Sequence, residues 1–476
     1  MRAVNSFILF LCSLMGLIKC GPSTLEAMVA FAQEDKTWSE PQLISTQSYP
    51  IYTEYTELIS DPYGRLHAFW DGGPKAQNPA DQEFAIYYTY LDAETGIWRE
   101  PLDILVNGRF PVVRIDSTGT LHLFASTDTC LIHASSPSTE AYSAIHWMQS
   151  QTCLADRQVS QFDVFLAPDD SLHLAYEQST SSINYLRSDD AGLTWSAPSR
   201  IVTQRDLSEA LSETAITIDN HNRIHVAWVS YPVPDAFPPL GIWYAFSDDG
   251  FSWSSPTQIA EDHHLHPQLF VSGEELHAIW NGALLRSERY HRSLDLNTET
   301  WSPITPWISA TGGVLGHPDA VVDGNGDIHA FGATDEGLWY AQLQDAIWLP
   351  AQRLYDPALQ TGNPNTAILL NNELHVIFRS RVDSIWHIMK PLDLPRNDPL
   401  IPPQATEKQI VQPLSNQSSQ TSTASTKVNQ IDIPRLPENL IAENATNTSV
   451  GFPLLLGTFF TFILLVLTLL FKFKTR

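Results

Sequence analysis

Basic residues are scarce in this chain of 476 residues, where 27 Lys and Arg stand against 53 Asp and Glu and give a formal net charge of −26. Nucleic-acid binding requires clustered Lys and Arg to meet the phosphates, and no such cluster is present. The composition therefore excludes a nucleic-acid partner. The acidic excess is better suited to keeping an exposed domain soluble.

Methionine and cysteine are also rare, with 5 and 4 copies, whereas there are 14 Trp, 15 Tyr and 21 Phe. Aromatic residues are enriched in strands, so this balance indicates a β-rich protein rather than a helical bundle. Cys12 and Cys20 lie in or beside an N-terminal apolar segment. Cys130 and Cys153 are predicted to form a disulfide in an oxidising compartment, with two free thiols as the alternative.

The N-terminus carries an export signal. An apolar run over residues 7–18 follows Arg2 and is short for a membrane span, as in the core of a signal peptide. Ala30 and Ala32 offer a small-residue cleavage site, which predicts a signal peptide over residues 1–32. Residues 17–20 resemble a lipoprotein box with Lys19 in place of a small residue, so lipidation of Cys20 stays open.

The C-terminus carries a membrane anchor. Residues 451–471 contain no charge, and at about 1.5 Å per residue a helix over them is predicted to be long enough to cross the hydrocarbon layer. The basic residues of the tail, 472–476, place that end in the cytoplasm. We expect a single-pass protein at the cell membrane, with everything before the helix outside the cytoplasm.

Between these signals one phrase recurs: a polar turn, an aliphatic residue, a histidine and a further aliphatic or aromatic stretch. Its histidines are His67, His122, His173, His225, His277, His329 and His375. The spacing of about fifty residues indicates a structural repeat. Six of the seven copies also contain a third apolar stretch, such as GIWYAFS over 241–247 or AIHWMQS over 144–150, and most end on a Trp-Ser-Pro-like phrase. Four strands per repeat are typical of a β-propeller blade.

The two ends of the array predict ring closure. The seventh repeat lacks a fourth strand, whereas the chain enters the array with a lone fourth-strand phrase at residues 38–44. The N-terminal strand can complete the last blade and remove an exposed sheet edge. We predict an all-β, seven-bladed propeller over residues 37–390, with six blades as the alternative. The Ser-, Thr-, Pro-, Gln- and Asn-rich residues 391–450 are predicted to be a disordered stalk.

One hairpin carries a recognisable motif. Residues 188–195 match Ser-x-Asp-x-Gly-x-Thr-Trp through Ser188, Asp190, Gly192, Thr194 and Trp195. A shortened copy contains Asp248, Gly250 and Trp253. The chain thus resembles the sialidase-like propellers with Asp-box (BNR) repeats. The resemblance implies that Asp caps the turn, Gly permits positive φ and Trp packs between blades.

The resemblance implies a fold more firmly than an activity, because Asp boxes are structural turns. The repeat histidines are expected to be buried between blades and to bind no metal. The turn residues Asp61, Asp116, Asp219 and Asp323 lie on the same rim as the Asp boxes and are expected to form turns.

A ligand is expected on the opposite rim, where the inter-blade connections and the loops between the second and third strands lie. The candidate binding residues there are Glu54, Asp71, Arg109, Glu213, His266, His317, Arg379 and Arg381. Sialidases need three arginines that clamp a carboxylate and a Tyr nucleophile with a Glu partner. The Arg-Ile-Pro of that family is missing here, and Val113-Arg114-Ile115 is the nearest phrase.

Two functions remain open on these residues. The first is a non-catalytic surface propeller that binds a glycan or a cell-surface protein on this rim. The second is a membrane-anchored exo-sialidase-type glycosidase. Nothing in the sequence implies a cofactor.

Overall fold

The structure is a computed structural model that describes residues 38–45, 51–52, 55–74, 83–92, 95–235, 237–261, 263–283, 288–309, 314–354, 361–368, 372–380 and 384–394. The signal peptide, nearly all of the stalk and the C-terminal apolar run lie outside these residues. Within the described ranges, no helix has both the length and the apolar character needed to cross a membrane.

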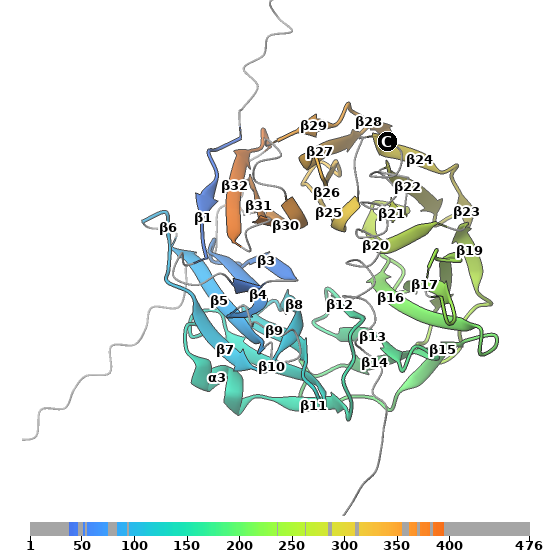
Figure 1. Cartoon of the computed structure of the whole chain (residues 1–476), viewed down its shortest axis with the longest axis horizontal. Helices are drawn as coiled ribbons and strands as arrows, with labels where there is room; N and C mark the ends of the chain where they lie inside the picture. Colours follow the sequence, from blue (N-terminus) through green and yellow to red (C-terminus); the bar gives the residue numbers. More distant parts are fainter. Residues whose placement is uncertain are drawn as a thin grey trace, which may run out of the picture. The chain divides into compact units, whose positions relative to one another are not determined.

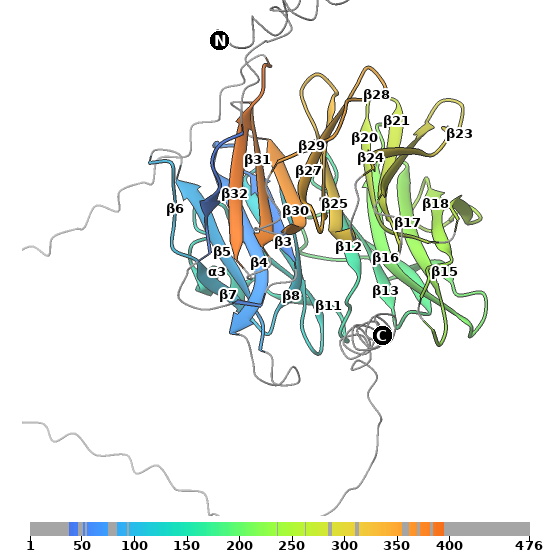
Figure 2. The ribbon, with the colours of Figure 1, turned by 45° about the horizontal axis from the view of Figure 1, so that its top comes forward.

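The described residues form seven antiparallel sheets arranged as blades around a central axis (Figure 1). The innermost strands are β3 (Thr56–Ser60), β8 (Arg109–Ile115), β12 (Phe162–Leu166), β16 (Glu209–Ile218), β20 (His264–Ser272), β25 (Val314–Val322) and β30 (Thr361–Ile368). The second strands are β4 (Leu66–Pro74), β9 (Thr120–Ser126), β13 (Leu172–Gln178), β17 (Ile224–Pro232), β21 (Glu275–Gly282), β26 (Ile328–Thr334) and β31 (Glu373–Ser380). The strands run from one face of the ring to the other (Figure 2).

The outer half of each blade is less regular. The third strands are β5 (Ala85–Asp92), β10 (Leu131–Pro137), β14 (Ser182–Ser188), β18 (Gly241–Ser247), β22 (Glu288–Asp295), β27 (Gly337–Gln344) and β32 (Ile385–Pro391). The outermost pieces are β6 (Ile97–Trp98) with β7 (Leu102–Val106), β11 (Thr152–Ala155), β15 (Ser199–Thr203), β19 (Thr257–Ala260), β23 (Thr300–Trp301) with β24 (Thr305–Ser309), β28 (Ile347–Trp348) with β29 (Gln352–Arg353), and β1 (Gln42–Leu43). A short extra strand, β2 (Ile51–Tyr52), pairs with the end of β4. The seven-bladed prediction is confirmed.

The second blade departs from the prediction. The expected third strand at residues 144–150 is wrong, because Ala144–Gln149 forms helix α3. The third-strand place is taken by β10, which pairs with β9 along its whole length. Helix α3 buries Trp147 completely against the first blade, where it supplies the tryptophan that the second blade lacks in its fourth strand.

The same kind of aromatic pair occurs at every contact between successive blades. A Tyr or His of the third strand packs against a Trp of the following blade, with ring centroids 5.2–6.5 Å apart. The pairs are Tyr88–Trp147, His133–Trp195, Tyr185–Trp253, Tyr244–Trp301, His291–Trp348, Tyr340–Trp38 and His387–Trp98. The expectation that the motif Trp packs between blades is confirmed.

Ring closure follows the sequence prediction. Strand β1 pairs antiparallel with β32, and the Ile44 amide donates to the Ile385 carbonyl at 2.9 Å. Trp38 lies edge-on to Phe331 at 5.8 Å and to Tyr340 at 5.4 Å, so the N-terminal segment also covers the face of the sixth blade.

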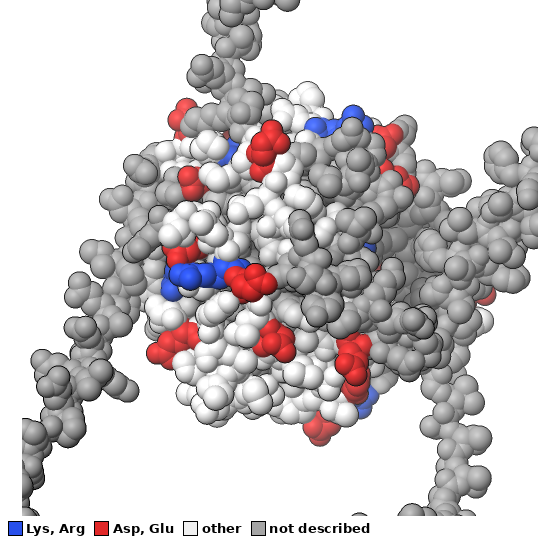
Figure 3. Space-filling model, turned by 60° about the vertical axis from the view of Figure 1, so that its left-hand side comes forward, with Lys and Arg blue, Asp and Glu red and all other residues white. Residues whose placement is uncertain are grey.

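Covalent and surface features complete the scaffold. Cys130 and Cys153 form a disulfide that links β10 to the start of β11. Acidic side chains are spread over the face shown in Figure 3, where basic ones are fewer. This distribution agrees with the net charge of the whole sequence.

Replacing Trp38 by Ala removes the aromatic contact that joins the closing segment to the sixth blade. We expect the free energy of unfolding to fall by about 3 kcal/mol, as for other large-to-small core substitutions. Thermal and denaturant unfolding of the full-length protein in detergent measure this loss. Phe251→Ala is the control, because that side chain is 73% exposed and its removal should change stability by less than about 0.5 kcal/mol. Equal stability of the Trp38→Ala variant and the unaltered chain would contradict closure by this segment.

Candidate functional site

The seven repeat histidines are structural. Each is at most 4% exposed, and each ring nitrogen Nδ1 lies within hydrogen-bond distance of a third-strand side chain. The partner is a tyrosine hydroxyl at His67, His173, His225 and His329. It is the Nε2 of a second histidine at His122, His277 and His375. In the part of the chain that the structure describes, no group of three or more His, Cys, Asp or Glu is placed to hold a metal ion.

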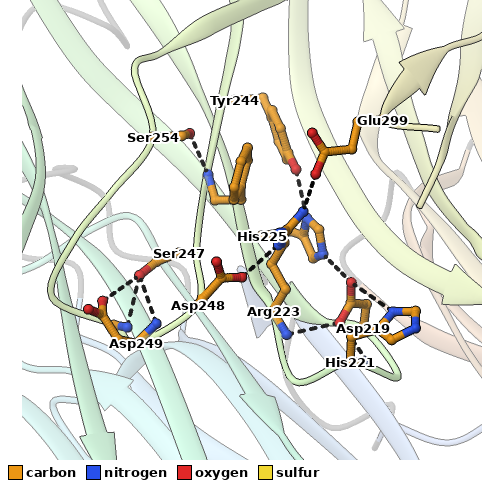
Figure 4. Close-up of polar contacts among 12 residues, drawn as sticks. Asp219, His221, Arg223, His225, Tyr244, Ser247, Asp248, Asp249, Ser254 and Glu299 are labelled. Atoms are coloured by element: carbon orange, nitrogen blue, oxygen red, sulfur yellow. Dashed lines mark hydrogen bonds and ion pairs between the residues drawn. The ribbon is translucent and has the colours of Figure 1, made fainter. Parts of the chain in front are cut away.

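The turn carboxylates anchor the same histidines, as the fourth blade illustrates (Figure 4). Asp219 accepts from the amides of His221 and Arg223 at 2.8 and 2.9 Å, and its other oxygen lies 3.1 Å from Nε2 of His225. Burial raises the pKa of such a carboxyl, but the His225 bond and the backbone amides outweigh burial and lower it overall. Asp61, Asp116 and Asp323 make the corresponding turns, so their expected structural role is confirmed.

Burial also holds the paired histidines neutral. It lowers the pKa of His277 to about 4, and burial together with the neighbouring His277 lowers that of His291 to about 3. Below an ordinary histidine pKa of about 6.5 the unfolded chain binds protons that the folded chain does not. Stability is therefore lost as the pH falls from about 6.5 towards 3.

His291→Tyr tests this linkage, because four blades already carry tyrosine at the equivalent position. The tyrosine hydroxyl can still bond His277, and one titrating group is removed. Between about pH 6.5 and 5, the free energy of unfolding falls in both proteins. We expect it to fall by up to about 2 kcal/mol less in the variant than in the unaltered chain. His221→Tyr is the control, because that side chain is 59% exposed. Melting temperatures measured against pH decide, and identical slopes for His291→Tyr and the unaltered chain would contradict the assignment.

The full Asp box has the geometry that its motif predicts. Asp190 accepts from the Thr194 amide at 2.8 Å and from the Thr194 hydroxyl at 2.6 Å. Ser188 accepts from the amide of Gly192, which has a φ of +82°. Trp195 then contacts His133 of the preceding blade.

The shortened Asp box corrects one prediction. Asp249, and not Asp248, caps this turn, because it accepts from the amides of Phe251 and Ser252 at 2.8 and 2.7 Å. Asp248 points outward and binds Arg223 instead, at 2.7 Å (Figure 4). Compared with the full Asp box, the shortened copy lacks one residue between the capping Asp and the Gly. The capping Asp therefore still stands two positions after the serine, Ser247.

This assignment predicts different effects for two adjacent carboxylates. Asp249→Ala leaves two backbone amides of the turn without their acceptor and should lower the melting temperature by about 2–4 °C. Asp248→Ala removes one exposed ion pair and should lower it by less. Thermal unfolding of the two variants side by side measures the difference, and a larger loss for Asp248→Ala would refute the corrected assignment.

A cavity of about 500 Å³ lies on the propeller axis and is lined by the innermost strands. Most of the lining residues named below fall into three tiers. The tier of a residue depends on how many sequence positions it stands before the turn that ends its strand. The upper tier contains Tyr55, Phe110, Gln161, Glu213, His266 and His317. The middle tier contains Glu57, Asp163, Gln268 and Asp319, and the lower tier contains Ile59, Arg114 and Val321.

The upper tier stands on bulged backbone. Phe110, Glu213 and His266 have φ values of +54 to +56°, and the strand register shifts beside each of them. Positive φ is unfavourable for residues with a side chain and persists only where neighbours enforce it. Bulges turn these side chains towards the mouth of the cavity.

Side chains of the second strands stabilise this bulged backbone through hydrogen bonds that connect adjacent blades. Asp71 accepts from the amides of Tyr55 and Phe110 at 2.8 and 3.1 Å. Asn281 donates to the Gly316 carbonyl of the next blade at 2.7 Å and lies 3.0 Å from His266 Nδ1. Such buried bonds position the mouth, and both oxygens of Asp71 are used in them.

The rings of the upper tier form an arc. Phe110 lies 4.9 Å from Tyr55, Tyr55 lies 5.6 Å from His317, and His317 stacks on His266 at 4.0 Å. Glu213 continues the arc, because it accepts from the His266 amide at 2.7 Å and from the Tyr231 hydroxyl. Burial lowers the pKa of both histidines to about 3 and raises that of Glu213.

Deeper in the cavity, the guanidinium of Arg114 meets two carboxyl groups. Arg114 lies 3.1 Å from Asp163 and 3.7 Å from Glu57. Burial raises the pKa of Glu57 to about 8; Arg114 opposes this rise, whereas Asp319 and Asp163 add to it.

The structure brings together three of the predicted rim residues, Glu213, His266 and His317, at one cavity mouth. Asp71 is fully buried. Arg109 lies with its guanidinium 4.0 Å from the ring of Phe84, and Arg379 is half-buried on β31. Glu54 and Arg381 lie outside the described residues.

Sequence reasoning missed Tyr55, Phe110, Glu57 and Asp163. Their signal was present in the repeat register: cavity residues stand six and four positions before the turn residue of each blade. The bulge hides this signal, because it breaks the alternation of inward and outward side chains.

Three arginines of the described residues contact groups of the protein itself. Arg114 binds carboxylates below the mouth. Arg289 is completely buried and donates to the Ala333 carbonyl, and Arg109 stacks on Phe84 and Phe110.

The architecture is that of a seven-bladed β-propeller, and two of its hairpins carry Asp-box turns. Among solved structures, an ulvan lyase of polysaccharide lyase family PL25 aligns with a TM-score of 0.50 and 12% identity over 71% of this chain and 94% of its own. A fungal alcohol oxidase in complex with copper aligns with a TM-score of 0.50 and 12% identity over 75% and 76%.

The NanB sialidase from Streptococcus pneumoniae aligns with a TM-score of 0.43 and 12% identity over 74% of this chain and 70% of its own. At these identities the likeness concerns the fold alone. No family model and no curated protein sequence matches the chain.

Proposed function

We propose that this protein is a surface-displayed, membrane-anchored propeller that binds a glycan in its axial cavity without cleaving it. The observation that carries this proposal is the upper tier, where aromatic rings and hydrogen-bonding side chains surround the mouth of a cavity of about 500 Å³. This volume lies within the range of small-ligand sites. Sugars present apolar ring faces and hydroxyl groups, which suit such a mixed surface.

The proposed display at a membrane is supported by the sequence. The apolar residues 451–471 supply the anchor, and the polar residues 391–450 supply a stalk that lifts the propeller away from the bilayer. The cavity mouth would then face ligands outside the cytoplasm.

An exo-sialidase-type glycosidase is the second candidate. The Tyr231–Glu213 pair favours it, because a tyrosine with a carboxylate partner is the nucleophile that such enzymes use. The engagement of Arg109, Arg114 and Arg289 with groups of the protein itself argues for binding without this chemistry.

Binding of the full-length protein in detergent micelles to a glycan array tests the first proposal. We expect a defined set of glycans to bind, and Gln161→Ala to weaken that binding about tenfold, because it removes an upper-tier hydrogen-bonding group. Leu193→Ala is the control, since this side chain is 82% exposed on the rim of the Asp boxes. An array without binding, or equal effects of the two variants, would refute glycan binding in this cavity.

Turnover of a fluorogenic sialoside by the same preparation distinguishes the two candidates. No turnover is expected. Robust hydrolysis that is lost in Tyr231→Phe would instead establish the glycosidase.

A further inference from the structure

The wall of the axial cavity carries far more acidic than basic groups. Glu57, Asp163, Glu213 and Asp319 line it, and Arg114 is its single guanidinium among the described residues. Arg114 is already engaged by Asp163 at 3.1 Å and Glu57 at 3.7 Å and donates to the Val113 carbonyl. A ligand that enters the cavity therefore meets a surplus of carboxyl groups within a low-dielectric wall.

Two other arginines lie near the mouth, and both contact groups of the protein. The charge of Arg289 adds to burial in lowering the pKa of His266. Arg289 is completely buried and donates to the Ala333 carbonyl. Arg109 packs its guanidinium over the rings of Phe84 and Phe110, at 4.0 and 4.9 Å from their centroids. Neither residue lines the cavity.

The aromatic arc above the carboxyl groups is a second feature that favours a cation. Ring faces carry negative charge density and attract ammonium groups. Tyr55 and Phe110 lie edge-to-face at the mouth, and Arg109 over Phe110 shows that a ring of this arc already holds one cation. The two neighbouring histidine rings are neutral at physiological pH, because burial lowers their pKa to about 3.

We propose that the axial cavity binds a sugar that carries a protonated amine, and that it excludes sugars that carry a carboxylate. The ammonium group lies against the aromatic arc at the mouth. The carboxyl groups of the middle tier, next to the arc, compensate its positive charge. This inference rests on the proposed glycan-binding function and gives it a ligand class. It also separates the cavity from sites that bind the carboxylate of an acidic sugar through guanidinium groups directed at the ligand.

The state of Glu57 supports this assignment. Its side chain is 19% accessible within the cavity, and it lies beside Arg114. Burial, together with Asp319 and Asp163, raises its pKa to about 8 despite that arginine. A positive charge in the cavity would favour the ionised form, so Glu57 can gain an ion-pair partner when an amine binds.

Calorimetric titration of the full-length protein in detergent tests the inference with three probes. These are a glucosamine trisaccharide, its fully N-acetylated counterpart and a sialylated trisaccharide. We expect the free amine to bind at least about tenfold more tightly than the N-acetylated sugar, and the sialylated sugar to bind most weakly. Glu57→Gln and Asp319→Asn preserve side-chain size and should each reduce the preference for the amine about fivefold or more. Asp189→Asn, 71% exposed on the rim of the Asp boxes, should leave it unchanged.

The outcomes separate this inference from the proposed function. Equal or tighter binding of the N-acetylated or sialylated sugar overturns the amine preference and leaves glycan binding intact. An amine preference that persists in both folded variants, Glu57→Gln and Asp319→Asn, overturns its location in the cavity. Absence of binding by all three sugars and by the glycan array overturns both proposals.

Discussion

The contact between a third-strand ring and a tryptophan of the next blade is the interaction on which the rest of the structure depends. A four-stranded blade cannot bury both of its faces alone, so it is stable only when a neighbour covers it. The ring of seven such contacts must also close, and Trp38 packed against Tyr340 makes the closing contact. Helix α3 illustrates the strength of this demand, because it inserts Trp147 where the strand pattern supplies no tryptophan.

Closure of the ring brings the innermost strands together and creates the axial cavity. The backbone at the mouth is unfavourable for ordinary residues, as the positive φ of Phe110 and His266 shows. Buried bonds between blades stabilise it, above all those of Asp71. Scaffold and site are thus coupled: residues that hold successive blades in register also hold the side chains that a ligand would meet.

The Asp boxes and repeat histidines serve the scaffold at the opposite rim. His225 connects the turn carboxylate Asp219 to Tyr244 (Figure 4). Tyr244 in turn contacts Trp301 of the following blade. Polar residues that recur in every blade are therefore structural here. Residues that differ from blade to blade, such as Gln161 and Glu213, line the cavity and give it its chemistry.

The sequence by itself determined the repeat, closure by the N-terminal strand and the full Asp-box turn, because these depend on short-range periodicity and turn chemistry. It favoured seven blades over six, and the structure settled the number. Sequence reasoning failed at helix α3, which stands where a third strand was expected, and at Asp248, where the shortened Asp box moves the capping role to Asp249. Only the tertiary structure decided the site. Glu57, Arg114 and Asp163 belong to different blades, and they meet because ring closure brings the innermost strands around one axis. Bulges set which side chains face that axis, and their positions depend on bonds between blades that local sequence does not specify.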